Sequence, residues 1–178
     1  MAQMEDALKN KITALTRLLD VTKVFKNDKE ACEIDEGVFL GSVAAANNRE
    51  YLKRNNVTHI LTVASSIAPA HPNDFVYKIV AVADRETTNL RKYFDECFSF
   101  IDEAKRHGGG ALVHCFVGKS RSVTIVVAYL MKKRGMSLSQ ALSYVRERRH
   151  QASPNWGFMS QLGEFESSLR DDSRCFLE

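Results

Sequence analysis

The chain of 178 residues contains little proline and little glycine, three and nine residues respectively. This scarcity excludes a collagen-like repeat and a long low-complexity linker. Apolar residues make up 44% of the chain and charged residues 26%, which is typical of globular proteins. At roughly 100–200 residues per domain, the length indicates one domain with a sizeable buried core.

Long hydrophobic runs are also missing. The longest apolar run, around residues 123–131, is far shorter than the ~20 residues that a membrane-spanning helix needs. The first residues, MAQMEDALKNK, lack the apolar core of a secretory signal peptide. We therefore expect a protein without a membrane span that is located in the cytoplasm, in the nucleus or in both.

Neither sign of charge dominates, because 25 Lys and Arg residues against 22 Asp and Glu residues give a net charge of +3. Such a small excess does not indicate a nucleic-acid-binding protein. The four cysteines, Cys32, Cys97, Cys115 and Cys175, are far apart and form no Cys-x-x-Cys pair. This spacing argues against a zinc site and against a framework of disulfides. We expect no metal and no other cofactor.

The hydrophobic pattern divides the chain into an N-terminal extension (residues 1–30), a compact domain (31–170) and a short tail (171–178). Within the extension, residues 5–27 predict an amphipathic helix rich in Lys and Arg. Such a helix can pack on the domain as an ordinary extra helix. Alternatively, its residues 8–27 can bind calmodulin or a membrane surface, and packing and calmodulin binding are compatible.

Within the domain, short apolar segments of strand length alternate with longer segments of helical periodicity. The predicted strands are residues 37–40, 59–63, 75–82 and 111–114. The predicted helices are residues 42–54, 90–104, 122–134, 137–149 and 155–169. Gly135 ends the third of these helices, and Ser137 with Gln140 forms a capping box for the fourth. The alternation predicts an α/β fold, a twisted and largely parallel sheet of four or five strands with helices on both faces.

The most informative segment is HCFVGKSRS, residues 114–122, which follows a predicted buried strand and opens a predicted helix. In that position a loop points successive backbone N–H groups at one centre, and such a site binds phosphate without a metal. The predicted phosphate-binding residues are Phe116, Val117, Gly118, Lys119, Ser120 and Arg121. The combination of residue types is too specific for a chance pairing of a buried Cys with a surface Arg.

Each polar residue of this segment has an expected role. Cys115 would lie at the floor of the loop as a nucleophile, because N–H groups and the helix dipole stabilise its thiolate. Arg121 can hold two phosphate oxygens with its planar fork, and Gly118 gives the backbone room to turn. Ser122 can donate a hydrogen bond to the sulfur. His114 can tune the thiolate, or can be a buried His satisfied by its neighbours, and both roles can hold together.

The segment HCFVGKSRS resembles the His-Cys-x5-Arg-Ser/Thr signature of the cysteine-dependent protein phosphatases. AYLMKKRGMSLSQAL, SPNWGFMSQL and EIDEGVFLGSVAAANN are similar to segments of the dual-specificity branch of that family. The resemblance covers roughly residues 32–170 and is greatest to small plant dual-specificity phosphatases. Two residues depart from the family's usual loop. Val117 replaces Ala, and Lys119 replaces an aliphatic residue and makes the rim of the site more positive.

The resemblance implies a general acid at the end of the strand that precedes the long helix, where this chain has Asp84. Without a proton, the leaving oxygen of a phosphate ester departs poorly. Glu86 competes for the role, and Asp84 could instead be a carboxylate that only caps the next helix. Asn155 matches a family position that braces the loop, and it can also cap the helix that follows Pro154.

The implied activity is hydrolysis of phosphotyrosine and phosphoserine/threonine in proteins, without a metal, through a phosphocysteine on Cys115. Mitogen-activated protein kinases are the substrates that the family usually implies. A phosphoinositide phosphatase would use the same loop with extra basic residues, but only Lys119 is basic and Phe116 is not. A phosphoprotein-binding module would have lost Cys115, Arg121 or Asp84. A sulfur transferase would need neither that Arg nor an acid.

The remaining candidates have ordinary interpretations. Arg148 and Arg149 form a solvated basic helix end, or alternatively hold a second phosphate of the substrate. Cys97 lies on the apolar face of its predicted helix and is expected to be inert. Three aromatic residues are expected in the core: Phe94, Phe98 and Trp156.

Overall fold

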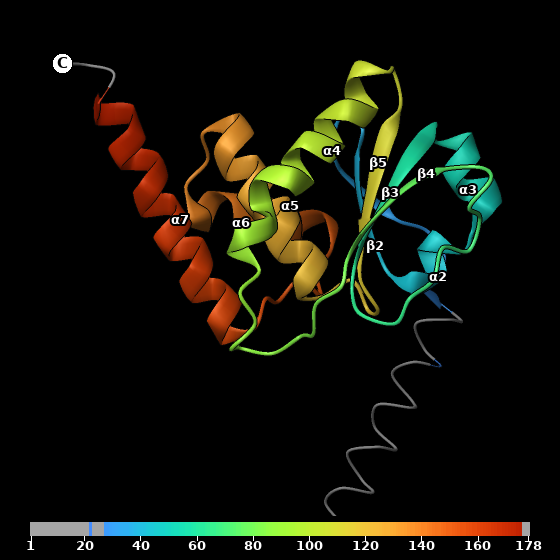
Figure 1. Ribbon diagram of the computed structural model, residues 1–178, viewed down its shortest axis with the longest axis horizontal. Coiled ribbons are helices and arrows are strands. Elements are labelled where there is room, and N and C mark those ends of the chain that lie inside the picture. The colour runs from blue at the N-terminus through green and yellow to red at the C-terminus, as the bar shows by residue number, and fades with distance from the viewer. Residues whose placement is uncertain (1–21, 23–26, 176–178) are drawn as a thin grey trace, which may run out of the picture.

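The computed structural model describes Thr22 and residues 27–175, in which a five-stranded sheet carries helices on both faces (Figure 1). The strands are β1 (Cys32–Asp35), β2 (Val38–Gly41), β3 (Val57–Val63), β4 (Val76–Val80) and β5 (Gly110–His114). Their order is β1-β2-β5-β3-β4, with β1 antiparallel to β2 and all other neighbours parallel. The predicted fold class is confirmed, whereas β1 is a strand that the sequence pattern did not predict.

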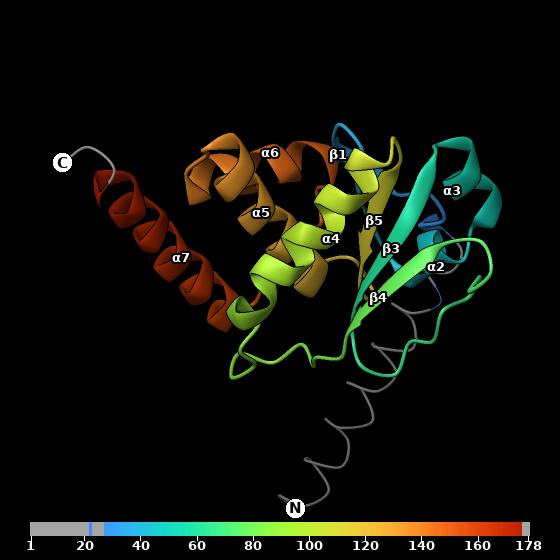
Figure 2. The same cartoon turned by 45° about the horizontal axis from the view of Figure 1, so that its top comes forward.

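The helices form two layers that sandwich the sheet. They are α2 (Val43–Ala46), α3 (Arg49–Arg54), α4 (Phe94–Arg106), α5 (Arg121–Arg134), α6 (Leu138–Arg148) and α7 (Trp156–Cys175), with a 3-10 turn η1 (Arg91–Tyr93) before α4. In both views α2 and α3 lie on one side of the sheet, and α4, α5, α6 and α7 lie on the other (Figures 1 and 2). Strand side chains alternate between the layers, so Leu112 packs toward α2 and α3 while Ala111 and Val113 pack toward the other four.

The position of β5 in the sheet determines where the site can form. All five of its residues are buried, because this strand is central and has a helix layer on each face. Its last residue, His114, pairs with Gly41 of β2 and with Thr62 of β3, so these parallel strands end at the same level. Residues that follow these strands therefore meet at one edge of the sheet, where ligands bind in open α/β sheets.

Local sequence signals set most helix boundaries, with one correction. The predicted single helix of residues 42–54 is two helices, because the side chain of Asn48 accepts a hydrogen bond from a backbone N–H and caps α3. Gly135 ends α5 in the left-handed conformation, with φ +64°, as predicted. The predicted capping box of Ser137 and Gln140 is present at the start of α6.

Two of the three aromatic residues expected in the core lie there, since Phe94 and Phe98 are buried. The prediction for Trp156 is wrong, because this side chain is 81% exposed. The buried stripe of α7 consists of Phe158, Leu162 and Phe165, and Trp156, two positions before Phe158, lies on a different face of the helix.

The predicted amphipathic helix of residues 5–27, with its segment 8–27, lies outside the described residues except for Thr22 and Asn27. Within the part of the chain that the structure describes, no helix combines the length and the apolar character needed to cross a membrane.

Candidate active site

Residues 115–121, which follow β5 and include the first residue of α5, are named the phosphate loop below. The carbonyl groups of this loop turn outward. The carbonyls of residues 116–120 all accept hydrogen bonds from residues outside the site. The Val43 N–H donates to the carbonyl of residue 116, and the Arg149 guanidinium donates to those of residues 117 and 118. The Ser153 N–H donates to the carbonyl of residue 119 and the Thr124 N–H to that of residue 120. Because C=O and N–H point in opposite directions across a trans peptide, the N–H groups of residues 117–121 face the other side. These inward N–H groups suit a phosphate group.

Cys115 lies at the floor of the phosphate loop and is 2% exposed. The Gly118 N–H donates a hydrogen bond to its sulfur at 3.3 Å, and the Ser122 hydroxyl lies 3.2 Å from the same sulfur. Both groups can donate to a sulfur that carries negative charge, which is the form that attacks and leaves in phosphoryl transfer.

Gly118 occupies a backbone position that has no room for a side chain. Its φ is +72°, and a Cβ atom added there would lie 2.4 Å from the Gly41 carbonyl oxygen and 2.5 Å from Arg149 Nη2. The Gly118 N–H donates to the Cys115 sulfur, and the Gly118 carbonyl accepts from Arg149 Nε. The tight packing on one side of the loop therefore fixes the donors on the other side.

His114 is buried and neutral. Burial lowers the pKa of its imidazole to about 4. Its Nδ1 lies 3.2 Å from the Cys115 carbonyl oxygen and its Nε2 lies 2.8 Å from Thr62 Oγ1. A neutral imidazole has one donor and one acceptor, so Nδ1–H donates to the carbonyl and Nε2 accepts from the hydroxyl. His114 is thus a satisfied buried His that also fixes the backbone of Cys115.

Asp84 lies at the mouth of the loop, after the end of β4. Its Oδ1 accepts hydrogen bonds from the Ser120 hydroxyl and from Asn155 Nδ2, both at 2.8 Å. Its Oδ2 lies 3.6 Å from Nε of Arg121. Within the described residues, the carboxylate contacts to the loop all come from Asp84, and none comes from Glu86.

Arg121 has a donor that makes no hydrogen bond among the described residues, although it lies 3.6 Å from Asp84 Oδ2. Its Nη1 donates to the Val82 carbonyl at 3.1 Å, which anchors the guanidinium. Its Nε is buried and has no hydrogen-bond acceptor among the described residues. Leaving a buried donor unpaired costs about 1–3 kcal/mol, so such a group in a site marks the place of an acceptor such as a phosphate oxygen.

Asn155 has both of the roles that the sequence left open. Its Oδ1 accepts from the Phe158 N–H at 3.0 Å and caps α7. Its Nδ2 donates to Asp84, and its backbone N–H donates to the Ser120 hydroxyl at 3.1 Å. The start of α7 is thereby fastened to the general-acid candidate and to the phosphate loop.

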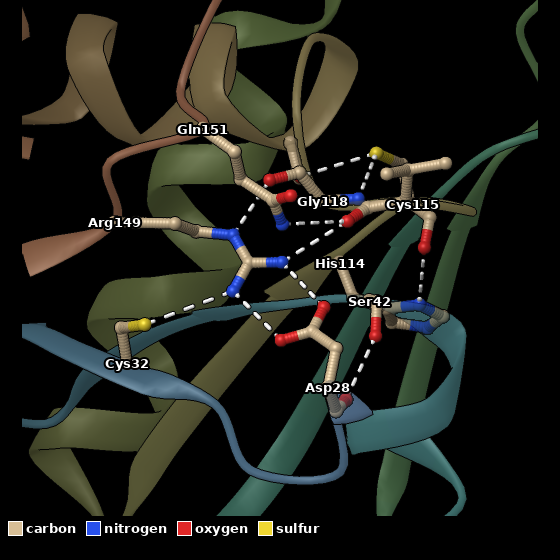
Figure 3. A network of polar contacts seen from close by, with 10 residues as sticks. Asp28, Cys32, Ser42, His114, Cys115, Gly118, Arg149 and Gln151 are labelled. Atoms are coloured by element: carbon tan, nitrogen blue, oxygen red, sulfur yellow. Dashed lines mark hydrogen bonds and ion pairs between the residues drawn. The ribbon is translucent and has the colours of Figure 1, made fainter. Parts of the chain in front are cut away.

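The interpretation of Arg149 as a solvated helix end is wrong, because its side chain is 3% exposed and it donates to the loop carbonyls of Val117 and Gly118 (Figure 3). Its counterion is Asp28, which is 121 residues away in the chain, so no local pattern could have indicated the pair. Arg148 is exposed and stacks on the Tyr144 ring, with 3.8 Å between its Cζ and the ring centroid, as expected of a solvated helix end.

The family model described as dual specificity phosphatase, catalytic domain, matches residues 38–168 of this chain. The chain belongs to this family. Dual specificity protein phosphatase 1 of Arabidopsis thaliana is 60% identical over 171 residues, which are 96% of this chain and 86% of that protein. Dual specificity protein phosphatase 1B of the same plant is 59% identical over 151 residues, covering 85% of this chain and 90% of the relative.

Solved structures agree with this assignment. The human tyrosine phosphatase-like serine/threonine/tyrosine-interacting protein superposes with a TM-score of 0.77 at 35% identity, covering 79% of this chain and 98% of that chain. Human DUSP28 superposes with a TM-score of 0.76 at 34% identity, covering 79% and 95%. The predicted family and enzyme class are confirmed: the chain is a dual specificity protein phosphatase, which acts on phosphotyrosine and on phosphoserine/threonine in proteins. The matched residues include every predicted site residue from Asp84 to Asn155.

Proposed function

We propose that this phosphatase works in two steps through a phosphocysteine on Cys115. The observation that carries the proposal is the orientation of the phosphate loop, in which the carbonyls of residues 116–120 bond to residues outside it and the Gly118 N–H donates to the Cys115 sulfur. Donors fixed before the substrate arrives stabilise charge in the transition state at no cost of reorganisation. Nε of Arg121 makes no hydrogen bond among the described residues, lies 3.6 Å from Asp84 Oδ2, and adds a charged donor to the same site.

In the first step the Cys115 thiolate attacks phosphorus, and an S–P bond forms as the ester O–P bond breaks. The loop N–H groups and Arg121 bind the three oxygens that remain on phosphorus. Asp84 gives its proton to the leaving oxygen, which departs as a neutral hydroxyl group. Ser120 and Asn155 hold the Asp84 carboxyl at the mouth of the loop for this transfer.

In the second step water attacks the phosphocysteine. Asp84, now ionised, takes a proton from the water as the new O–P bond forms and the S–P bond breaks. The sulfur leaves as a thiolate, which the Ser122 hydroxyl at 3.2 Å and the Gly118 N–H at 3.3 Å stabilise. Inorganic phosphate is released and the enzyme returns to its starting state.

The test compares Cys115→Ser and Asp84→Asn with Glu86→Gln as a matched carboxylate control. Cys115→Ser abolishes turnover but retains phosphopeptide binding, because the loop N–H groups and Arg121 remain. Asp84→Asn slows hydrolysis of phosphopeptides by a factor on the order of 10²–10⁴, the usual contribution of acid catalysis, and slows an activated aryl phosphate less. Equal losses on both substrates, or an equal loss in Glu86→Gln, would contradict the role of Asp84.

Two further readouts test the class of substrate and the absence of a metal requirement. Turnover should be unchanged by EDTA, and inhibition that an added metal reverses would contradict the mechanism. A phosphoinositide phosphatase remains the alternative, because Lys119 is exposed at the rim of the loop. We infer a preference for phosphopeptides, since Phe116 and Val117 leave the rim only partly basic. Faster phosphate release from soluble phosphoinositides than from phosphopeptides would reverse this assignment.

We propose mitogen-activated protein kinases as substrates, on the resemblance to the dual-specificity family alone, and a location in the cytoplasm, the nucleus or both. We also propose calmodulin as a partner of residues 8–27, whose sequence combines basic residues with bulky apolar ones. A peptide of these residues should bind calmodulin with calcium and lose binding in Leu19→Glu. Absence of binding by both the peptide and the full chain would leave the segment as packing.

A further inference from the structure

Arg149 uses its whole guanidinium inside the protein. Its Nε donates to the Gly118 carbonyl at 2.7 Å, and its Nη2 donates to the Val117 carbonyl at 3.0 Å and to Asp28 Oδ2 at 2.7 Å. Its Nη1 donates to Asp28 Oδ1 at 3.2 Å and to Cys32 Sγ at 3.7 Å. A guanidinium has five N–H groups, and these five acceptors account for all of them. No donor of Arg149 is left for a second phosphate of the substrate, which was the other interpretation of this residue.

The two carbonyls that Arg149 holds fix two peptide planes of the phosphate loop. Since the planes are trans, the Gly118 N–H and the Lys119 N–H point away from Arg149, toward the inner side of the loop. The first of these donates to the Cys115 sulfur at 3.3 Å. Figure 3 shows the resulting connection from Asp28 through Arg149 and Gly118 to Cys115. Gln151 also donates to the Val117 carbonyl, so the Gly118 carbonyl depends most on Arg149.

Asp28 belongs to a segment that lies before the family domain, which begins at residue 38. This segment, residues 28–31, is fastened to the domain independently of the Asp28 carboxylate. Ser42 Oγ donates to the Asp28 carbonyl at 3.1 Å, Asn48 Nδ2 to the Lys29 carbonyl at 2.9 Å, and the Tyr51 hydroxyl to the Ala31 carbonyl at 2.6 Å. Its backbone should therefore stay in place when the carboxylate is changed.

We propose that Asp28 and Arg149 are positioning residues of the phosphate loop, through which the segment before the family domain sets the loop's affinity for phosphate. Arg149 orients the two peptide planes, and Asp28 neutralises and aims Arg149. The carboxylate is required because a buried cation without a counterion would be drawn toward solvent and away from the carbonyls. The proposal rests on the proposed role of the loop in binding phosphate.

The decisive experiment measures inorganic phosphate as a competitive inhibitor of the full-length enzyme, in the wild type and in Asp28→Asn. The matched control is Asp35→Asn. Asp35 forms an ion pair with Arg134 through two hydrogen bonds, both at 2.9 Å. In the sheet Asp35 pairs with Val38, the first residue of β2, and the phosphate loop lies at the other end of that strand. Asp28→Asn should raise the Ki for phosphate by about five- to tenfold, the lower range of couplings between sites. Asp35→Asn should leave Ki unchanged or lower it slightly, because it only removes a negative charge far from the loop.

The sign of the change separates positioning from simple electrostatics. Both substitutions remove one negative charge, and a more positive protein should bind phosphate more tightly. A weaker affinity in Asp28→Asn therefore requires that the loop donors have moved. An unchanged or lower Ki in Asp28→Asn, with thermal unfolding showing an intact fold, would overturn the proposal.

Arg149→Lys tests the path through Arg149. Lysine keeps the charge but lacks the planar fork that reaches both carbonyls and the carboxylate, so Ki should rise at least as much as in Asp28→Asn. The double variant should be no worse than Arg149→Lys alone, because Asp28 acts through Arg149. Additive losses would overturn that path. If phosphate fails to compete in the wild type itself, the proposed role of the loop fails and this inference fails with it.

Discussion

Replacing Gly118 by Ala tests how closely the phosphate loop is packed against its braces. The added methyl group has two separate costs. A residue with a Cβ is strained at φ +72°, which costs about 1–2 kcal/mol. The Cβ would also lie 2.4 Å from the Gly41 carbonyl oxygen, so the backbone of the loop or of β2 must shift. Overpacking of this kind typically costs about 1–3 kcal/mol.

Gly135→Ala provides a matched control for the first cost. Gly135 has φ +64°, and an added Cβ would have nothing within 4 Å. This variant should lose only the conformational contribution of about 1–2 kcal/mol. The difference in unfolding free energy between the two variants, about 1–3 kcal/mol, therefore measures the clash at the loop. The two costs of Gly118→Ala add to about 2–5 kcal/mol, which is less than the stability of a domain in the middle of the usual range of about 5–15 kcal/mol.

The assay combines urea unfolding with the Ki for inorganic phosphate. Because Gly118 donates to the Cys115 sulfur and accepts from Arg149, a shift of its backbone disturbs both sides of the loop. Gly118→Ala should raise Ki by about tenfold or more, equivalent to about 1.4 kcal/mol, while Gly135→Ala leaves it unchanged. Equal unfolding free energies and equal Ki values in the two variants would refute the close packing inferred here.

Three further outcomes are expected. The pKa of His114 is about 4 in the fold, against 6.5 for an exposed imidazole, so the unfolded chain binds a proton first as the pH falls. Stability should therefore drop by on the order of 3 kcal/mol between pH 6.5 and 4, and urea unfolding of His114→Gln should show a flatter profile. Peroxide should oxidise Cys115 before Cys97, because burial raises the pKa of Cys97 to about 12; mass spectrometry showing the reverse order would contradict this. Asn155→Asp should keep the cap of α7 but lose the donor to Asp84, so the unfolding midpoint holds while turnover of substrates with poor leaving groups falls. A parallel fall of turnover on activated aryl phosphates would contradict a role of Asn155 in acid catalysis through Asp84.

Features that depend on neighbouring residues could be predicted from the sequence. The left-handed Gly135 at the end of α5 and the capping box of α6 each follow from a few adjacent side chains. The phosphate loop is similar, since one short segment contains Cys115, Gly118 and Arg121. Asp84 could be placed near it only by adding a rule of topology, that parallel strands end at one edge of the sheet.

Features that depend on distant residues could not be predicted in this way. Arg149 stands at the end of a helix in the sequence, where a basic residue is normally solvated, and only the folded chain brings Asp28 to it. The exposure of Trp156 could not be predicted either, because the hydrophobicity of one side chain does not show which face of α7 packs on the domain. The edge strand β1 has few consecutive apolar residues, and its pairing with β2 supplies what its sequence lacks.

The braces of the phosphate loop come from four separate parts of the domain. Val43 begins α2, Arg149 follows α6, Ser153 precedes α7, and Thr124 lies in α5. The carbonyls of residues 116–119 accept no hydrogen bond from within the loop and are held by these distant residues, so the geometry of the loop is a property of the whole domain. Loosening the connection between α6 and α7 should therefore weaken phosphate binding before it unfolds the sheet, because two of the four braces lie at the ends of that connection.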